Sequence, residues 1–311
     1  MKISVIIPVY NAEKYVTKAV NSVLQFDEVD EVILIEDGSP DHALTVCLEL
    51  AQKHERVQLF QHSDKKNHGA GASRNLGIEK ASGDFIAFLD ADDYFLSNRF
   101  DAEKEHFKNS DIEGVFNAIG TEFLTEKGRE DFLSNINDNH LLTVNYPAEG
   151  HEVFRGLLGK TPTAFGSFFT LDALTIRNSA LEKYNLKFNE ELRVHQDSDF
   201  IIKLAFHCHL KSGIIDQPVA MRGIHDDNRI TKIVKYSPQY NQRQFLFWNS
   251  LYQWSQENRL DPDISEHIYL KKKAFELSQK KGFSKMMTLF TAILKDPKIL
   301  KTQYRFTYTH S

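Results

Sequence analysis

The first ninety residues alternate between short apolar runs and segments in which apolar residues recur every three or four positions. Consecutive β-branched and apolar residues are typical of strands buried on both faces of a parallel sheet, whereas the spaced pattern is typical of helices packed on that sheet. The apolar runs predict strands at Ile3–Pro8, Val32–Ile35, Val57–Phe60 and Phe85–Leu89. This repeated order indicates an α/β fold with a doubly wound, mostly parallel sheet, whose ligands bind beyond the carboxyl ends of the strands.

Polar residues mark where the helices between these strands are expected to begin. Asn11 is the expected N-cap of the first helix, and Ser39–Pro40 supplies a cap and a first turn for the second. A third helix is predicted near Arg74–Lys80, after a polar loop that contains glycine. Ser97 is expected to cap a fourth helix, over 97–109.

The remainder of the chain is less regular. The segment 120–165 is polar and holds two prolines, which indicates a loop-rich insertion or short antiparallel strands. Apolar residues return at helical spacing in Asp197–Leu210, which predicts a helix there. Beyond about residue 232 the chain becomes aromatic and lysine-rich, and further helices are expected. The sequence therefore predicts a catalytic body over 1–231 and a helical C-terminal region over 232–311.

Charge divides at the same point. The whole chain carries 38 basic and 43 acidic side chains, a net charge of −5. Residues 1–231 hold 24 basic and 37 acidic side chains, and residues 232–311 hold 14 and 6. The body is thus acidic, at −13, and the C-terminal region basic, at +8. An acidic body disfavours nucleic-acid binding, and 41% hydrophobic residues exclude wholesale disorder.

The cysteines and the N-terminal sequence indicate the cellular compartment in which the protein is expected. Cys47 and Cys208 lie among apolar residues and are expected to be buried, reduced thiols. The N-terminal apolar run is broken by Pro8 and Asn11, and it is too short for a signal-peptide core or a membrane span. The sequence predicts a cytoplasmic protein, with membrane contact limited to a peripheral one on the inner face.

The strongest candidate for chemistry is the sequence LDADD, at Leu89–Asp93. A buried strand that ends in Asp-x-Asp would place Asp90 and Asp92 on one side of the chain, because strand side chains alternate. Such carboxylates repel one another unless a cation lies between them, and Mg²⁺ or Mn²⁺ suits their oxygen ligands. A solvated acidic turn is the alternative interpretation.

Three further motifs are predicted at the same rim of the sheet. PVYN follows the first strand, EDGSPD follows the second, and Arg74 opens the helix after the glycine loop. An aspartate can accept a hydrogen bond from a base, an arginine can pair with phosphate, and a metal can bridge a diphosphate. The set describes a site for a nucleoside diphosphate.

Together, PVYNAEKY, EDGSPD, GAGASRNLGIEKASGDFIAFLDADD and HQDSDF resemble the family 2 inverting glycosyltransferases of the GT-A fold, over roughly 1–225. The resemblance implies a donor half over about 1–110 and an acceptor half over about 111–231. It implies transfer of a hexosyl or N-acetylhexosaminyl group from a nucleotide sugar, usually a UDP-sugar, with Mn²⁺ or Mg²⁺. The acceptor would be a saccharide or a lipid-linked saccharide, in synthesis of cell-surface polysaccharide or glycolipid.

The family pattern also implies roles for single residues. Those that would hold the nucleotide sugar are Pro8, Val9, Tyr10, Glu13, Asp37, Arg74, Asp90 and Ala91. Asp37 would bind the uracil, and Asp90 would contact the ribose or the groups around the metal. Arg74 would lie against the nucleotide or diphosphate, and Asp92 would bind the metal. The family's usual Asp-Asp pair reads Glu36-Asp37 here, which keeps the carboxylate that reads the base.

The catalytic base is expected in HQDSDF. Inverting transfer is a single displacement in which an acceptor hydroxyl attacks the anomeric carbon, and it needs a carboxylate to accept the proton. By the family pattern this carboxylate is Asp197, with Asp199 in reserve. Asp197 could instead only cap its helix and favour the helix dipole, and the two interpretations are compatible.

His225, in GIHDDNRIT, is a weaker candidate for the metal site. Some relatives carry a histidine after the last strand that approaches the metal or the diphosphate, and the alternative is a solvated loop histidine. His207 and His209 are interpreted as structural, because residues two apart diverge on a helix.

The basic C-terminal region has three open interpretations. It could be a solvated face, or a homodimer interface built on Trp248 and Trp254. It could also be a peripheral contact with an anionic membrane, because lysines of 271–285 lie beside Phe283, Met286 and Met287.

Two other functions compete with glycosyl transfer. A sugar nucleotidyltransferase would have a glycine-rich, arginine-containing loop directly after the first strand, where PVYNAEKY stands. An inactive, sugar-binding subunit of a polysaccharide-synthesis complex would be favoured if Asp92 or Asp197 were missing, and both are present.

Overall fold

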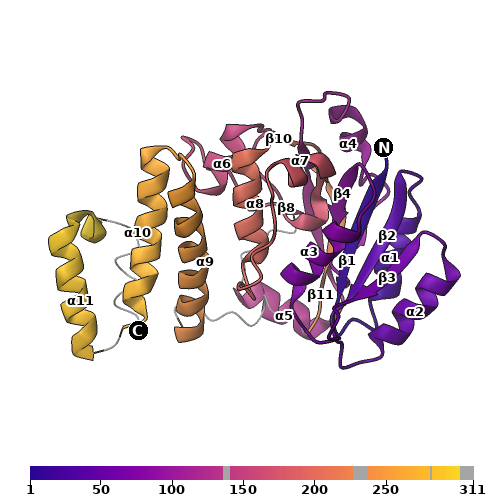
Figure 1. The fold of residues 1–311 in the computed structure, drawn as a ribbon, viewed down its shortest axis with the longest axis horizontal. Coiled ribbons are helices and arrows are strands. Elements are labelled where there is room, and N and C mark those ends of the chain that lie inside the picture. Colours follow the sequence, from indigo (N-terminus) through magenta and orange to yellow (C-terminus); the bar gives the residue numbers. More distant parts are fainter. Residues whose placement is uncertain (136–140, 227–236, 281, 302–311) are drawn as a thin grey trace. The chain divides into compact units, whose positions relative to one another are not determined.

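The structure is a computed structural model, shown in Figure 1. The residues that it describes are 1–135, 141–226, 237–280 and 282–301. Internal contacts divide the chain into two compact units, each treated separately below. The first unit comprises Met1–Arg193 with Phe200–Thr231, and the second comprises Val194–Asp199 with Lys232–Ser311. The expected division into domains at 231, and into donor and acceptor halves, stays a prediction.

The first unit is built on a seven-stranded sheet in the order β10-β6-β9-β4-β1-β2-β3 (Figure 1). Its strands are β1 (Ile3–Val9), β2 (Val29–Glu36), β3 (Val57–Gln61), β4 (Phe85–Phe88), β6 (Gly114–Phe116), β9 (Leu174–Arg177) and β10 (Leu210–Ser212). Only β9 runs antiparallel to its neighbours among these strands. The predicted apolar runs became β1, β2, β3 and β4. Of these, β1, β2 and β4 lie inside the sheet and are buried, whereas β3 lies at its edge and is mostly only partly buried. The predicted α/β fold with a mostly parallel sheet is confirmed.

Helices connect and cover these strands. They are α1 (Val16–Leu24), α2 (Ala43–Lys53), α3 (Ala70–Lys80), α4 (Asp101–His106), α7 (Asn178–Lys183) and α8 (Gln196–His207), with a short 3₁₀ turn η1 (Leu171–Ala173). α3 lies close against β1, because a Cβ atom on Gly77 would lie 2.3 Å from Cγ2 of Ile6. Cys47 and Cys208 are free and buried, as expected.

The expected helix starts were wrong at four places: those of α1, α2 and α4 are described here, and that of α3 is described with the site. α1 begins at Val16 rather than after Asn11, which has φ +54° and turns the chain directly after β1. α2 begins at Ala43 rather than at Ser39–Pro40, since the Ser39 amide donates to Oε1 of Glu36 (2.5 Å) in a turn that closes on β2.

The third wrong start is that of α4, which begins at Asp101 instead of Ser97. The amide of Arg99 donates to the carbonyl of Leu96 (3.0 Å), so the preceding residues form a turn. The Arg99 side chain is fully buried and donates to the carbonyls of Asp172 (2.9 Å) and Leu174 (3.1 Å). This turn is therefore shaped by tertiary hydrogen bonds and not by a helix cap.

A second, four-stranded sheet in the order β5-β11-β7-β8 completes the first unit. Its strands are β5 (Tyr94–Phe95), β7 (Ala118–Phe123), β8 (Leu141–Leu142) and β11 (Pro218–Ile224). The segment 120–165, expected to be loop-rich or to form short strands, contains β8 and also two helices, α5 (Glu126–Asn135) and α6 (His151–Leu157). β11 pairs with β5, which follows the acidic sequence directly, so it brings the distant residues 222–225 toward that sequence.

The second unit is helical, as expected for the C-terminal region. Its helices are α9 (Pro238–Glu257), α10 (Pro262–Ser278) and α11 (Gly282–Lys295), followed by the 3₁₀ turn η3 (Pro297–Lys301), in orange to yellow in Figure 1. Ser237 caps α9 by accepting from the amide of Tyr240 (3.1 Å). Among the described residues, we find no helix that combines the length and the apolar character needed to cross a lipid bilayer.

Candidate active site

The acidic sequence forms a turn at the carboxyl end of β4. The strand ends at Phe88, and the amide of Asp93 donates to the carbonyl of Asp90 (3.1 Å) to close the turn. Carboxylate oxygens of Asp90, Asp92 and Asp93 lie within 4.8 Å of one another. The expectation that the carboxylates converge is met, but strand alternation is not the reason, because these residues lie beyond the strand.

Each carboxylate of this turn has a different partner. Asp90 pairs with Nη2 of the buried Arg74 at 2.5 Å. Oδ2 of Asp92 lies 3.1 Å from Nε2 of His225. Asp93 is buried, and its Oδ1 accepts from the amide of Gly223 on β11 (2.9 Å).

A fourth carboxylate, Asp172, lies beneath the turn and was not anticipated. It is buried on η1, and its Oδ1 accepts from the amide of Asp90 (2.8 Å). Burial, and then the charge of Asp90, raise the pKa of Asp172 to about 7. Burial and the charges of Asp172, Asp92 and Asp90 hold the pKa of Asp93 well above its usual value. These four residues, called the carboxylate cluster below, repel one another.

Two arginines face the carboxylate cluster. Arg74 lies in the second turn of α3, which begins at Ala70 rather than at Arg74 as expected. Arg222, on β11, was not anticipated. Burial lowers the pKa of its guanidinium, and the charge of Asp93 opposes that effect. The two cations offset part of the negative charge, while burial, and then the neighbouring carboxylates, keep the pKa values of Asp93 and Asp172 raised.

The donor set suits a divalent cation. Carboxylate oxygens are the ligands that Mg²⁺ and Mn²⁺ prefer, and Mn²⁺ also accepts an imidazole nitrogen. The convergence of Asp90, Asp92 and Asp93 places suitable oxygens together, and a cation would relieve the repulsion that raises the neighbouring pKa values. Asp92 and His225, the two metal ligands predicted from the sequence, lie side by side.

His225 is held from a second side. Its ring stacks on the ring of Tyr15, with centroids 4.6 Å apart and an interplanar angle of 26°. Its backbone lies against Gly128, where an added Cβ atom would lie 2.9 Å from Cα of His225. His225 is buried, so the interpretation as a solvated loop histidine is wrong. Tyr15 belongs to PVYNAEKY, but nothing in the sequence marked it as a partner of residue 225.

The residues expected to hold the nucleotide lie at three strand ends: Pro8 to Glu13 at and after the end of β1, Asp37 after β2, and Ala91 in the acidic turn after β4. Val9 and Ala91 are buried, whereas the side chain of Tyr10 is exposed. Glu13 is exposed, and it accepts from the amide of His42 (3.3 Å). Pro8 is partly buried within β1. Only Tyr10 and Glu13 of this group present their side chains to solvent.

Asp37 is buried and satisfied by its own chain. Its carboxylate accepts from Nδ2 of Asn67 (2.9 Å) and from the amides of His68 (2.7 Å) and Gly69 (2.8 Å). Its own amide donates to the carbonyl of Val9 (2.9 Å). Asp37 therefore fastens the glycine loop to the end of β2, and its contact with a uracil stays a prediction.

Asp197 lies in the first turn of α8 and is exposed, whereas Asp199 is fully buried. Both belong to Val194–Asp199, which groups with the second unit. The preceding His195 has φ +64°, and its carbonyl accepts from the amide of Asp199 (2.9 Å). The role of Asp197 as the base, with Asp199 in reserve, stays a prediction.

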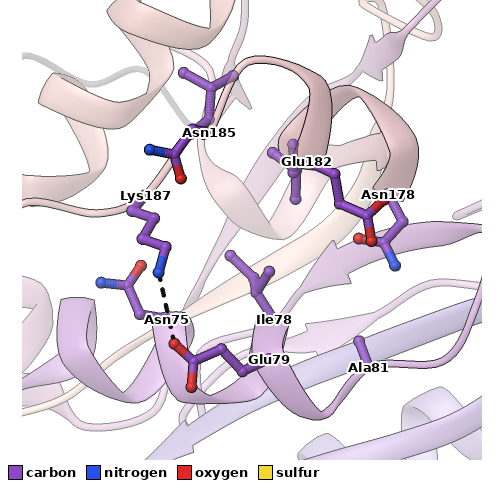
Figure 2. A pocket seen from close by; sticks show the side chains of 10 residues that line it. Asn75, Ile78, Glu79, Ala81, Asn178, Glu182, Asn185 and Lys187 are labelled. Carbon is purple, nitrogen blue, oxygen red and sulfur yellow. Dashed lines mark ion pairs between the residues drawn. The ribbon is translucent and has the colours of Figure 1, made fainter.

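A pocket of about 280 Å³ lies between α3 and α7 (Figure 2). Lys187 and Glu79 pair at 3.7 Å along its wall. Asn75 also lines it, but its side chain is already engaged by the Phe188 carbonyl (3.0 Å) and by Glu190 (2.9 Å). The pocket shares no residue with the site predicted from the sequence.

The sheet order and the acidic turn at its carboxyl edge define the GT-A fold. The solved structure of TarS from S. aureus in complex with UDP-GlcNAc is similar, with a TM-score of 0.61 over 96% of this chain and 81% of that chain, at 20% identity. The mannosyltransferase PcManGT from Pyrobaculum calidifontis, in complex with GDP-Man and Mn²⁺, is similar with a TM-score of 0.53 at 14% identity, over 99% and 83% of the two chains.

The sequence model of Glycosyl transferase family 2 matches residues 4–172, more than half of the chain, and the chain belongs to this family. An uncharacterized glycosyltransferase of Rickettsia bellii is 38% identical over 137 residues, which are 44% of this chain and 19% of that protein. The minor teichoic acid biosynthesis protein GgaB of Bacillus subtilis is 28% identical over 219 residues, or 69% and 22%. The matched segment thus spans about a fifth of each of these relatives.

Proposed function

We propose that this chain is a metal-dependent, inverting glycosyltransferase. It would move a hexosyl or N-acetylhexosaminyl group from a nucleotide sugar to a hydroxyl of a saccharide or lipid-linked acceptor, in synthesis of cell-surface polysaccharide or glycolipid. The observation that carries the proposal is the carboxylate cluster at the carboxyl end of β4, with Arg74 and His225 against it. Membership of Glycosyl transferase family 2 supports the reaction class.

The donor is proposed to be a UDP-sugar. The complex of TarS with UDP-GlcNAc and the exposed Tyr10 beside the buried Asp37 support this choice. Mn²⁺ or Mg²⁺ would be held by Asp92, with His225 and other carboxylates of the cluster, and PcManGT is a structural neighbour with Mn²⁺. A bound divalent cation supplies charge stabilisation for a departing diphosphate. Arg74, held in place by its ion pair with Asp90, would add a positive charge that belongs to the protein itself.

The base is proposed to be Asp197. The acceptor oxygen forms a bond to the anomeric carbon, the bond from that carbon to the diphosphate oxygen breaks, and the hydroxyl proton passes to the Asp197 carboxylate. The position of Asp197 in the first turn of α8 favours this role, because its exposed carboxylate is accessible to an acceptor. Asp199 is buried and less accessible to an acceptor.

The proposed acceptor, and the proposed place of action in the cell, are supported by the name of the relative GgaB and by the charge of the C-terminal region. A teichoic acid relative favours an acceptor of the cell envelope. Such an acceptor would be met at the cytoplasmic face of the membrane, and the basic C-terminal region would favour attachment there.

Donor binding and transfer test the proposal separately. Isothermal titration should show UDP binding that needs Mn²⁺, and a panel of nucleotide sugars should show metal-dependent hydrolysis or transfer with at least one of them. Asp92→Asn is expected to lose metal-dependent UDP binding. Asp197→Asn is expected to keep UDP binding and to lose about a thousandfold or more in turnover.

The matched control is Asp111→Asn, because Asp111 is an exposed carboxylate outside the site. It should behave as the wild type. Normal turnover by Asp197→Asn would overturn the assignment of the base. UDP binding without turnover on any nucleotide sugar would favour an inactive, sugar-binding subunit, and no UDP binding at all would overturn the proposed function.

A further inference from the structure

Helix α11 leaves one apolar face in solvent. Phe283, Met286, Met287, Phe290 and Leu294 have exposed fractions between 48% and 76%. At about 100° per residue these positions fall within an arc of about 100° on the helix, so they form one stripe. Four of them, all but Met287, are the most exposed large apolar side chains among the residues that the structure describes. The five residues are called the α11 stripe below.

The opposite face of α11 is already used for folding. Leu289 and Ala292 pack against a small core of the second unit, formed by Ala274, Leu277 and Ile299. α11 therefore has two apolar faces, and a single face suffices to hold it in the unit. The α11 stripe is therefore exposed on a helix whose opposite face already packs against the core of the second unit.

The charge around the stripe has one sign. Residues 279–301 contain six lysines and one acidic residue, Asp296, so this segment carries a net charge of +5. Lys280, two residues before α11, and Lys295, its last residue, are exposed. An exposed apolar stripe flanked by lysines is typical of a helix that lies in the surface of an anionic bilayer.

A second copy of the chain fits the α11 stripe less well. A helix of 14 residues is about 21 Å long, and a stripe about 10 Å wide on it offers about 200 Å². A stable dimer needs about 800 Å² on each partner, and two segments of charge +5 would repel. A lipid surface needs no minimum matching area, and anionic headgroups would neutralise the lysines.

We infer that the α11 stripe inserts into the headgroup region of an anionic membrane, while Lys280 and Lys295 contact the lipid phosphates. This inference deepens the proposed function, since it rests on the placement of the enzyme at a membrane-borne acceptor. It makes no use of the carboxylate cluster, so the two can fail independently.

Vesicle co-sedimentation of the full chain tests the inference. We expect binding to vesicles of phosphatidylglycerol and phosphatidylcholine, weak binding to phosphatidylcholine alone, and loss of binding at high salt. The triple variant Phe283→Ser, Phe290→Ser and Leu294→Ser is expected to partition about a hundredfold more weakly. The double variant Lys280→Gln and Lys295→Gln is expected to lose about tenfold, and only on anionic vesicles.

The matched control is Leu48→Ser with Leu246→Ser, two exposed leucines outside the stripe. It should bind vesicles as the wild type does. Unchanged vesicle binding by the triple variant overturns the inference. So does a wild-type dimer in sedimentation velocity that the triple variant converts to a monomer, because the stripe is then an interface between copies.

A second measurement does not depend on the folding of the triple variant. Phe290→Cys can be labelled selectively with an environment-sensitive fluorophore, because Cys47 and Cys208 are buried. A blue shift on anionic vesicles is expected, and no shift overturns the inference. UDP binding with Mn²⁺, measured on the same samples, reports the proposed function: its loss together with intact vesicle binding counts against the enzyme assignment alone.

Discussion

Two sites with buried carboxylates lie at the same edge of the sheet, Asp37 alone and the carboxylate cluster with its buried Asp93 and Asp172, and their surroundings are opposite. Asp37 accepts three hydrogen bonds from the glycine loop, with distances from 2.7 to 2.9 Å. In the carboxylate cluster, Asp93 accepts from a single backbone amide, that of Gly223, and its pKa is raised by burial and by its neighbours. Donors of the fold itself stabilise the Asp37 carboxylate. The carboxylates of the cluster repel one another.

The difference distinguishes a carboxylate with a structural role from a cluster that we propose to bind a metal ion. Backbone amides stabilise the charge of Asp37 without any other molecule. The carboxylates of the cluster lie against one another as well as against donors, and Arg74 and Arg222 offset only part of their charge. A cation would complete the balance. Substitutions at the two places should therefore change stability in opposite directions.

The largest effect on stability is expected for Asp37→Asn. An amide at this position keeps one acceptor oxygen and turns an NH₂ group toward the other donors, so either the amide of His68 or that of Gly69 would lose its partner. The free energy of unfolding is expected to fall by about 2–4 kcal/mol, as measured by urea denaturation. Asp64→Asn, in the same loop but exposed, should denature almost as the wild type does. Equal midpoints for Asp37→Asn and the wild type would show that the loop does not depend on this charge.

Asp172→Asn is expected to have the opposite sign. The Asn side chain keeps an oxygen for the amide of Asp90 but removes a charge from the cluster. With a chelator present at pH 8, the free energy of unfolding is expected to rise by about 1–2 kcal/mol. Asp172→Ala is the contrast, because it removes the acceptor as well and should lower the stability.

The same residue predicts a pH dependence. The pKa of Asp172 is about 7 in the folded chain against an ordinary value of 3.8, so the folded chain binds more protons than the unfolded chain between these values. Stability in chelator should therefore fall as pH rises from about 4 to about 7. Asp172→Asn should flatten this profile in thermal unfolding, and an unchanged slope would contradict the assignment of the repulsion to this carboxylate.

The smallest effect is expected for Tyr15→Ala. It removes the ring that stacks on His225 while leaving the carboxylates in place. Loss of a stacked pair is worth about 0.5–1.5 kcal/mol, so Mn²⁺-dependent UDP binding should weaken about threefold to tenfold. Tyr15→Phe, which keeps the ring, should bind like the wild type. If both variants bind alike, the stack does not position His225.

Much of the fold could be predicted because its inner strands β1, β2 and β4 are buried on both faces and leave continuous apolar runs. The helix starts could not be predicted in this way. Asn11 adopts a left-handed conformation, the Ser39 amide binds the Glu36 carboxylate, and the Arg99 side chain binds distant carbonyls. No helix-cap pattern in the sequence reveals these features. Local patterns compete with tertiary hydrogen bonds at these positions, and the tertiary contacts prevail.

The candidate site divides in a similar way. Asp90, Asp92 and Arg74 belong to short, dense motifs and could be named from the sequence. Asp172 binds Asp90 from 82 residues away, and Gly223 binds Asp93 from 130 residues away. Nothing near them in the sequence marks them, because their role depends on the pairing of β9 and β11 with other strands.

The hydrogen bonds of Asp37 also have a kinetic consequence. They join positions 30 to 32 apart in the chain, so they can form only after the chain has closed that loop around β3. We expect them to be absent from the folding transition state, so that Asp37→Asn would speed unfolding and leave the folding rate nearly unchanged. This carboxylate would then set how long the glycine loop persists at the rim, and not how quickly it forms.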